Sequence, residues 1–141
     1  MRNDANNVET NGRPPDISNK VECPGCTVTV EAISDIVELS VSGQIRAENM
    51  PQIVEAIAKT LKHHQKPRLV DVRDAKGRLG IAETYFFVRS HNLKWRGVRT
   101  ALVDLPENAS YAAFHETTAT NAGRILRYFN TLEEARAWLR E

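Results

Sequence analysis

The chain has 141 residues, of which 41% are hydrophobic, and this is the size and composition of one ordinary domain with a continuous core. Lys+Arg 19 against Asp+Glu 18 leaves a formal net charge of +1, which excludes a protein whose overall field attracts nucleic acid or an anionic membrane. The sequence has no apolar run near the roughly 18 residues of a transmembrane segment, no signal peptide and only two cysteines, so we expect a cytoplasmic location.

The N-terminal part of the chain divides into a tail and a hairpin. Residues 1–20 carry almost no large apolar side chains, so we expect a disordered N-terminal tail there and an α/β domain over residues 27–141. Residues 27–33 and 36–42 are two β signals, and in the second of them Val37, Leu39 and Val41 alternate with polar residues. The short gap between these two runs predicts an antiparallel hairpin.

Helical and strand patterns then alternate to the end of the chain. Helices are predicted over residues 50–61, over 82–93, around 111–114 with an end at Gly123, and over 132–139, where Thr131 and Glu134 form a capping box. Strands are predicted over residues 69–72, 98–103 and 125–129. The order β-β-α-β-α-β-α-β-α predicts the α/β class, with a mixed, mostly parallel five-stranded sheet that has an antiparallel edge strand.

The strongest candidate site follows the strand at residues 69–72. Ligands of open α/β sheets gather beyond the carboxyl ends of the strands, and Asp71, Arg73 and Asp74 lie there beside a loop with Gly77 and Gly80. The predicted ligand- or partner-binding residues are Asp71, Arg73, Asp74, Lys76, Arg78, Gly80 and Tyr85. The alternative is that Asp71 and Arg73 only form an ion pair with each other and bind no ligand. Because no nucleophile–base grouping and no phosphate-binding loop occurs, we predict neither an enzyme nor a cofactor.

Three other motifs are interpreted as structural. Cys23 and Cys26 have the C-x-x-C spacing of zinc and redox sites, but the chain has no second cysteine pair, so a turn with two idle thiols is favoured. The adjacent His63 and His64 would point about 100° apart on a helix and cannot chelate a metal from one face. Residues 94–96 combine basic residues with Trp, as proteins that bind single-stranded nucleic acid do, but the near-zero net charge favours a solvated loop. We therefore expect no metal site and no nucleic-acid partner.

Several segments together carry a resemblance to a known family. They are Val41-Ser42-Gly43, residues 69–73, residues 120–123, and residues 125–129 followed by 132–139. On these, residues 37–139 resemble the STAS-like domains, specifically the anti-sigma-factor-antagonist-like (SpoIIAA-like) branch, which has also been compared with CRAL-TRIO lipid-carrying proteins. Members of the phosphoswitch branch carry a phosphorylatable Ser between the third strand and the next helix. Residues 73–82 contain no Ser or Thr, so this chain departs from that pattern.

The resemblance implies a regulatory or ligand-binding module and not a catalyst. The first hypothesis is a module of bacterial-type signalling that binds a protein partner, with a homodimer left open. The alternative is a carrier or sensor of an apolar, lipid-like small molecule held under the helices. A partner-binding module should expose an apolar patch at the loop face, whereas a carrier needs a cavity lined by residues such as Tyr85, Phe86, Tyr111 and Phe114.

Overall fold

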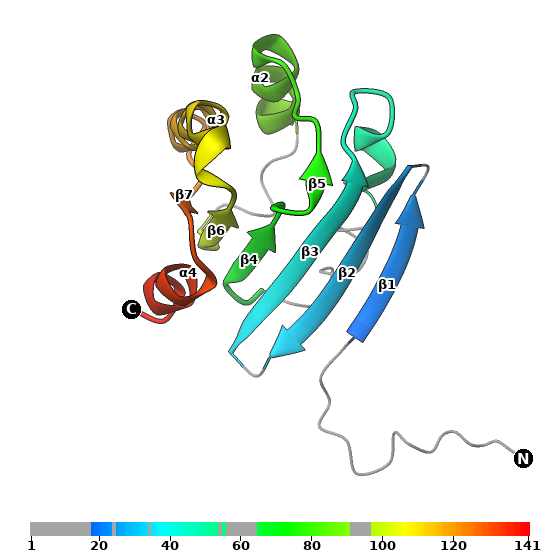
Figure 1. Ribbon diagram of the computed structural model, residues 1–141. Coiled ribbons are helices and arrows are strands. Elements are labelled where there is room, and N and C mark those ends of the chain that lie inside the picture. Colours follow the sequence, from blue (N-terminus) through cyan, green and yellow to red (C-terminus); the bar gives the residue numbers. More distant parts are fainter. Residues whose placement is uncertain (1–17, 24, 34, 54, 56–64, 91–96) are drawn as a thin grey trace, which may run out of the picture.

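The computed structural model describes residues 18–23, 25–33, 35–53, 55, 65–90 and 97–141 (Figure 1). The strands in chain order are β1 (Ser18–Cys23), β2 (Cys26–Ile33), β3 (Ile36–Gln44), β4 (Arg68–Asp71), β5 (Ala75–Lys76), β6 (Thr100–Val103) and β7 (Leu126–Phe129). The helices are α2 (Ile81–Ser90), the short 3-10 helix η2 (Pro106–Asn108), α3 (Ala109–Asn121) and α4 (Leu132–Leu139). Residues 50–53 and 55 are also helical.

All the described strands belong to one sheet with the order β1-β2-β3-β4-β6-β7, while β5 pairs with β3 beyond the end of β4. The pairs β1–β2 and β2–β3 are antiparallel, and β3–β4, β4–β6 and β6–β7 are parallel. This arrangement confirms the predicted α/β class and the mixed, mostly parallel sheet. The sheet has seven strands where the sequence predicts five, because β1 and β5 were not foreseen.

The first additional strand, β1, forms an antiparallel hairpin with β2 in the N-terminal part of the chain. In the β1–β2 hairpin Cys23 lies opposite Cys26, so the C-x-x-C motif forms the turn, with Gly25 at a φ of 78°. Residues 18–20, which the sequence analysis assigned to the tail, already belong to β1. Residues 1–17 lie outside the described part of the chain, and the tail there stays a prediction.

The predicted helices occur close to their expected positions. The predicted helix at 82–93 corresponds to α2, and residues 91–93 lie outside the described part. The helix predicted around 111–114 is the longer α3, which Gly123 follows at a φ of 86°. Of the helix predicted at 50–61, the described residues 50–53 and 55 are helical. No helix in these described ranges is long and apolar enough to cross a membrane.

The sheet buries side chains on both of its faces. Val37, Leu39 and Val41 of β3 pack into a cluster that includes Val88 of α2 and Ala112 of α3. The opposite face, with Leu69, Ala101 and Val103, packs against Ala135 and Leu139 of α4. The period of two in each strand therefore divides the core into two layers, with α2 and α3 on one face and α4 on the other (Figure 1).

The last helix is held by its cap and by two ion pairs. The Thr131 hydroxyl accepts a hydrogen bond from the Glu134 amide at 3.2 Å, which confirms the predicted N-cap. From the other end of the helix, Arg136 donates to Glu38 on β3 at 2.6 and 2.8 Å, and Arg140 donates to Asp35 at 2.8 and 3.3 Å. These contacts attach α4 to the sheet across about a hundred residues of sequence.

Candidate functional site

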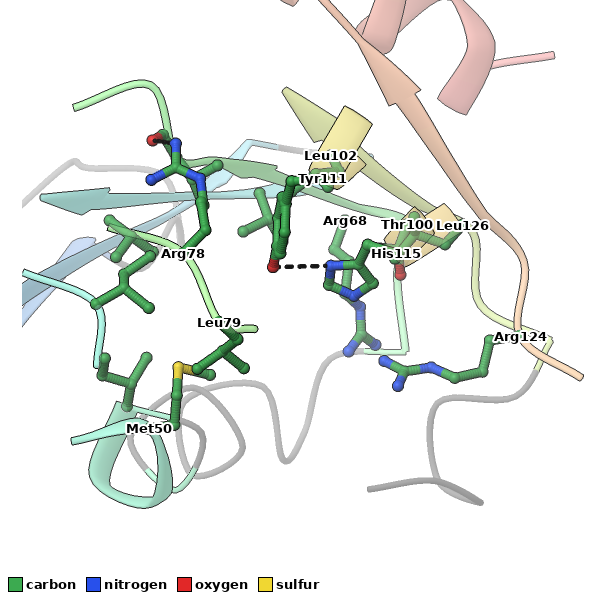
Figure 2. A pocket seen from close by; sticks show the side chains of 15 residues that line it. Met50, Arg68, Arg78, Leu79, Thr100, Leu102, Tyr111, His115, Arg124 and Leu126 are labelled. Carbon is green, nitrogen blue, oxygen red and sulfur yellow. Dashed lines mark hydrogen bonds between the residues drawn. The ribbon is translucent and has the colours of Figure 1, made fainter. Parts of the chain in front are cut away.

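A cavity lies on the sheet face that also carries α2 and α3, and its volume is about 120 Å³ (Figure 2). Its walls are mostly apolar, with Ile45, Met50, Ile53, Val70, Leu102 and Leu126 among the lining residues. The engineered apolar cavities that bind benzene have a volume of about 150 Å³. This cavity therefore has room for a small organic molecule.

The parallel strands determine which residues enter the cavity. In the register, Arg68 of β4 lies beside Thr100 of β6, which lies beside Leu126 of β7. All three residues line the cavity. Val70 and Leu102, which lie two residues further along β4 and β6, line it as well. Because alternate residues point to one face, the first residues of β4 and β6 lie at one end of the cavity, at the amino edge of the sheet.

That end of the cavity is cationic. Arg68 is 2% exposed and Arg124, which precedes β7, is 8% exposed. Burial, together with the nearby charge of Arg124, lowers the pKa of Arg68 to about 10, and burial also lowers the pKa of Arg124. Figure 2 shows the two guanidinium groups close together beyond the His115 ring.

His115 and Tyr111 of α3 form a polar pair between the two ends of the cavity. The Tyr111 hydroxyl lies 3.3 Å from Nδ1 of His115. Burial, with a smaller contribution from the charge of Arg124, lowers the pKa of His115 to about 4, so the imidazole is neutral at pH 7. Burial raises the pKa of Tyr111. The pair therefore adds hydrogen-bonding groups to the cavity and no charge.

Of the aromatic residues that the sequence predicts around a cavity, Tyr111 lines it. Tyr85 is 45% exposed and, like Phe114, lies outside the lining. The side chain of Phe86 is not among those that the structure describes. Arg68, His115 and Arg124 are not among the site residues predicted from the sequence. A signal for Arg68 existed, since it lies two residues before Val70 and four before Val72, and this even spacing places it on their face.

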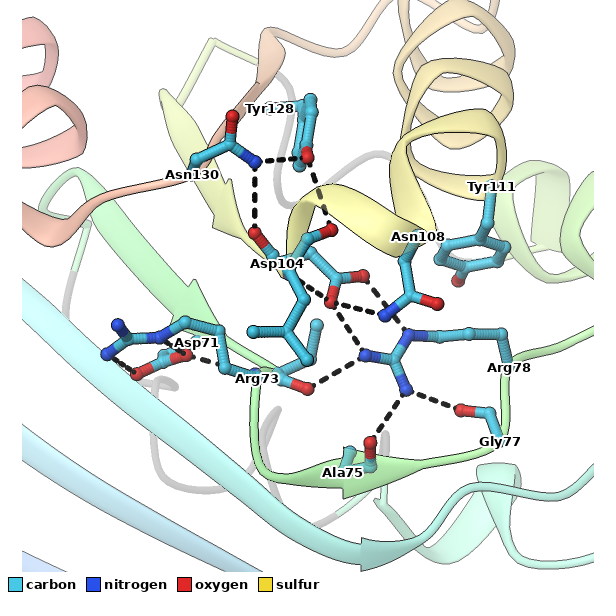
Figure 3. Close-up of polar contacts among 12 residues, drawn as sticks. Asp71, Arg73, Ala75, Gly77, Arg78, Asp104, Asn108, Tyr111, Tyr128 and Asn130 are labelled. Carbon is cyan, nitrogen blue, oxygen red and sulfur yellow. Dashed lines mark hydrogen bonds and ion pairs between the residues drawn. The ribbon is translucent and has the colours of Figure 1, made fainter.

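Arg78, one of the predicted binding residues, is fixed inside the fold at the carboxyl edge of the sheet (Figure 3). Its guanidinium donates to both carboxylate oxygens of Asp104, at 3.1 and 2.7 Å, and Asp104 is fully buried. It also donates to the carbonyl oxygens of Val72 and Ala75, each at 2.9 Å, and to that of Gly77 at 2.6 Å. A guanidinium has five N–H donors, and these five bonds use them all. Arg78 therefore holds the loop in place.

Asp71 and Arg73 bind each other. The Arg73 guanidinium donates to the two Asp71 oxygens at 2.9 and 2.8 Å, and the Arg73 amide donates to Oδ1 at 3.1 Å. These hydrogen bonds raise the pKa of Arg73. This ion pair is the arrangement that the sequence offered as the alternative to a binding site: Asp71 and Arg73 bind each other.

The remaining predicted site residues, Asp74, Lys76, Gly80 and Tyr85, are all exposed, and together with the exposed Ile81 we call them the loop face. The Gly80 amide donates to the Glu83 carboxylate at 2.7 Å. Ile81 is 74% exposed and lies one helical turn before Tyr85 on α2. The sequence did not single out Ile81.

The other motifs contribute little to a site in the described residues. Cys26 is buried in β2, whereas residues 63–64 and 94–96 lie outside the described part. Within residues 18–23, 25–33, 35–53, 55, 65–90 and 97–141, no group of three or more His, Cys, Asp or Glu residues could hold a metal ion.

Comparison with known proteins gives one family and a fold. The SpoIIAA-like family model matches residues 36–140. A solved structure of an uncharacterised protein with a SpoIIAA-like fold from Shewanella loihica PV-4 is 16% identical, with a TM-score of 0.56 over 91% of this chain and 99% of that chain. An anti-sigma factor antagonist from Mycobacterium paratuberculosis is 19% identical, with a TM-score of 0.58 over 82% of this chain and 95% of that one. Comparison with curated proteins gives no match.

Proposed function

Since this chain belongs to the SpoIIAA-like family, we propose that it is a non-catalytic regulatory module that binds a small apolar molecule under its helices. The family match confirms the resemblance of residues 37–139, while the comparison with CRAL-TRIO proteins stays a prediction. The observation that carries the proposal is the apolar cavity of about 120 Å³ between the sheet and the helices. A concave, mostly apolar pocket with few polar groups is the usual form of a small-molecule site.

The polar groups at the carboxyl edge support binding in preference to catalysis. Four of the charged side chains there are engaged in ion pairs, Asp71 with Arg73 and Arg78 with Asp104. A general base or nucleophile needs a neighbouring group that activates it. We place no such pair at this edge among the described residues, and the cavity runs along β4 from Arg68 at the amino end to Val72 and Arg78 at the carboxyl end.

Toluene tests the cavity, because it is apolar and close to benzene in size. We expect toluene near saturation to raise the thermal midpoint of the wild type by about 3–6 °C, through binding to the folded state alone. Val70→Phe, which fills the cavity, should abolish this shift. The matched control is Ile125→Phe, because Ile125 is 42% exposed outside the cavity lining. A toluene shift that survives Val70→Phe would contradict the proposal.

The loop face favours a second candidate function, a protein partner in bacterial-type signalling. Ile81 and Tyr85 expose apolar surface on the same side of α2, and Lys76, five residues before Ile81 in the sequence, is exposed at the end of β5. Such a surface fits a partner that covers the two apolar side chains and offers a carboxylate to Lys76.

A paired substitution tests the loop face. We expect Ile81→Ser combined with Tyr85→Ser to weaken partner binding at least tenfold, because exposed apolar anchors dominate interface energies. The measurement is quantitative affinity capture from bacterial extract, followed by titration of the retained protein, with Ile125→Ser as the matched control. Sedimentation of the purified protein alone shows whether it forms a homodimer, and a monomer would mean that the partner is a different protein. Equal affinity of the variant and the wild type would show that the interface lies on another surface.

A further inference from the structure

The C-x-x-C motif at the start of the sheet is explained neither by the cavity nor by the family match. Cys23 ends β1 and Cys26 begins β2, and both lie before the matched residues 36–140. The register of the hairpin places these two residues directly opposite each other. The backbone pairing therefore fixes how far apart the two cysteines lie, which their spacing in the sequence does not decide.

This pairing has the backbone geometry that a disulfide bond requires. The Cα atoms of directly opposite residues in an antiparallel pair are about 4.5–5.5 Å apart, and those of a disulfide are usually about 4.4–6.8 Å apart. Directly opposite residues also share one face of the sheet. A bond between the two sulfur atoms therefore needs no change in the register of β1 and β2.

Contacts with the end of β3 hold the turn that joins the two cysteines. Gly25 has a φ of 78°, and its carbonyl oxygen accepts a hydrogen bond from the Gln44 amide at 2.7 Å. Gly43, which lies opposite Cys26 in the register, permits this close approach because it has no side chain. A Cβ atom at Gly43 would lie 2.5 Å from the Gly25 oxygen and 2.9 Å from the Cys26 Cα atom. These contacts fix the position of the turn against the sheet.

The two cysteines differ in their place in the sheet. Cys26 is 4% exposed and belongs to the core cluster on the face that carries α2 and α3, whereas Cys23 belongs to β1, the edge strand. A pocket of about 380 Å³ borders the turn at Gly25, and Arg46 and Glu48 also line it. A small thiol or disulfide can therefore approach the turn from this pocket, while the Cys26 sulfur is covered by the core.

We propose that Cys23 and Cys26 form a reversible dithiol–disulfide site, and that its oxidant is a small-molecule disulfide of the glutathione type. In the first step the Cys23 thiolate attacks one sulfur of that disulfide, breaks its S–S bond and releases one thiol. In the second step the Cys26 thiol loses its proton to solvent and attacks the Cys23 sulfur, so that the protein disulfide forms and the second thiol leaves. The protein loses two electrons and two protons, and the small disulfide gains them. An excess of the small thiol reverses both steps.

Glutathione redox buffers test this site in the full wild-type chain. We expect the protein from an oxidised buffer, after acid quenching and alkylation, to carry no alkyl group and to weigh two hydrogens less than the reduced chain. An excess of reduced glutathione should restore two thiols that can be alkylated. Two alkylated thiols after the oxidised buffer, or a glutathione adduct that persists in it, would overturn the proposal.

Moving one cysteine out of register supplies the matched control. Cys26→Ser combined with Thr27→Cys keeps one cysteine on each strand, but Thr27 lies opposite Glu22, and its hydroxyl donates to that carboxylate at 3.1 Å. We expect the equilibrium constant for the internal disulfide to fall at least tenfold in this variant. An unchanged constant would show that the bond forms without the pairing of the hairpin, and it would overturn the inference.

The two single substitutions identify the attacking sulfur. Cys26→Ser should accumulate a one-to-one mixed disulfide between Cys23 and glutathione, because the second step has no thiol. Cys23→Ser should form its adduct at least tenfold more slowly, because the remaining Cys26 is buried. An adduct that forms on Cys23→Ser as fast as on Cys26→Ser would overturn the assignment of the first step to Cys23.

Discussion

Replacement of Arg78 by Ala is expected to lower the free energy of unfolding by about 3–5 kcal/mol, the cost of leaving a buried partner charge uncompensated. The Asp104 carboxylate has no exposed surface, and Arg78 donates to both of its oxygens. The same substitution also removes the donors to three backbone carbonyl groups of the loop. Urea denaturation measures the change.

Arg73→Ala is the matched control for this result. The Arg73 side chain is 36% exposed and pairs with Asp71, so its loss should cost only about 0–1 kcal/mol. The double variant Arg78→Ala with Asp104→Ala should be more stable than the sum of the two single changes predicts, by about 1–3 kcal/mol. Comparable losses for Arg73→Ala and Arg78→Ala would contradict a structural role that is specific to Arg78.

Leu39→Ala is expected to lower the free energy of unfolding by about 2–5 kcal/mol, as large-to-small substitutions in cores do. Leu39 has no exposed surface and lies in β3 between Val30 of β2 and Val70 of β4. The surrounding strands cannot close on the gap, because their backbones are fixed by the sheet ladder. Thermal and chemical unfolding measure the loss.

The adjacent residue is the matched control for Leu39→Ala. Ser40 is exposed on the same strand, so Ser40→Ala should change the stability by no more than about 0.5 kcal/mol. A small loss for Leu39→Ala, similar to that for Ser40→Ala, would show that β3 does not present Leu39 to the core.

Local patterns predicted much of the fold. The alternation of Val37, Leu39 and Val41 correctly gave the buried face of β3, and the Thr131 cap correctly gave the start of α4. The two strands that the sequence missed lack such a pattern. Residues 20–22 of β1 are Lys-Val-Glu, and β5 has two residues, so neither contains enough apolar positions to show a period.

The candidate site was harder to predict, because burial of a charged residue depends on distant parts of the chain. Arg78 pairs with Asp104, 26 residues away, only because β4 and β6 are neighbours in the sheet. Arg68 is buried because its strand lies between β3 and β6, and Arg124 faces it from the segment before β7. Sequence reasoning treats such residues as solvated by default, since charged side chains are seldom fully buried.

The edge position of β1 has a consequence for shortened versions of the chain. Residues 18–20 pair with Glu31, Val30 and Thr29, so a chain that begins at Val21 leaves this half of β2 without a neighbour. The uncovered backbone would belong to a strand rich in Val and Thr, which is a template for intermolecular pairing. In the intact chain, the exposed charges of Lys20 and Glu22 occupy the outer strand instead and discourage such pairing. The first strand therefore protects the sheet against aggregation as well as extending it.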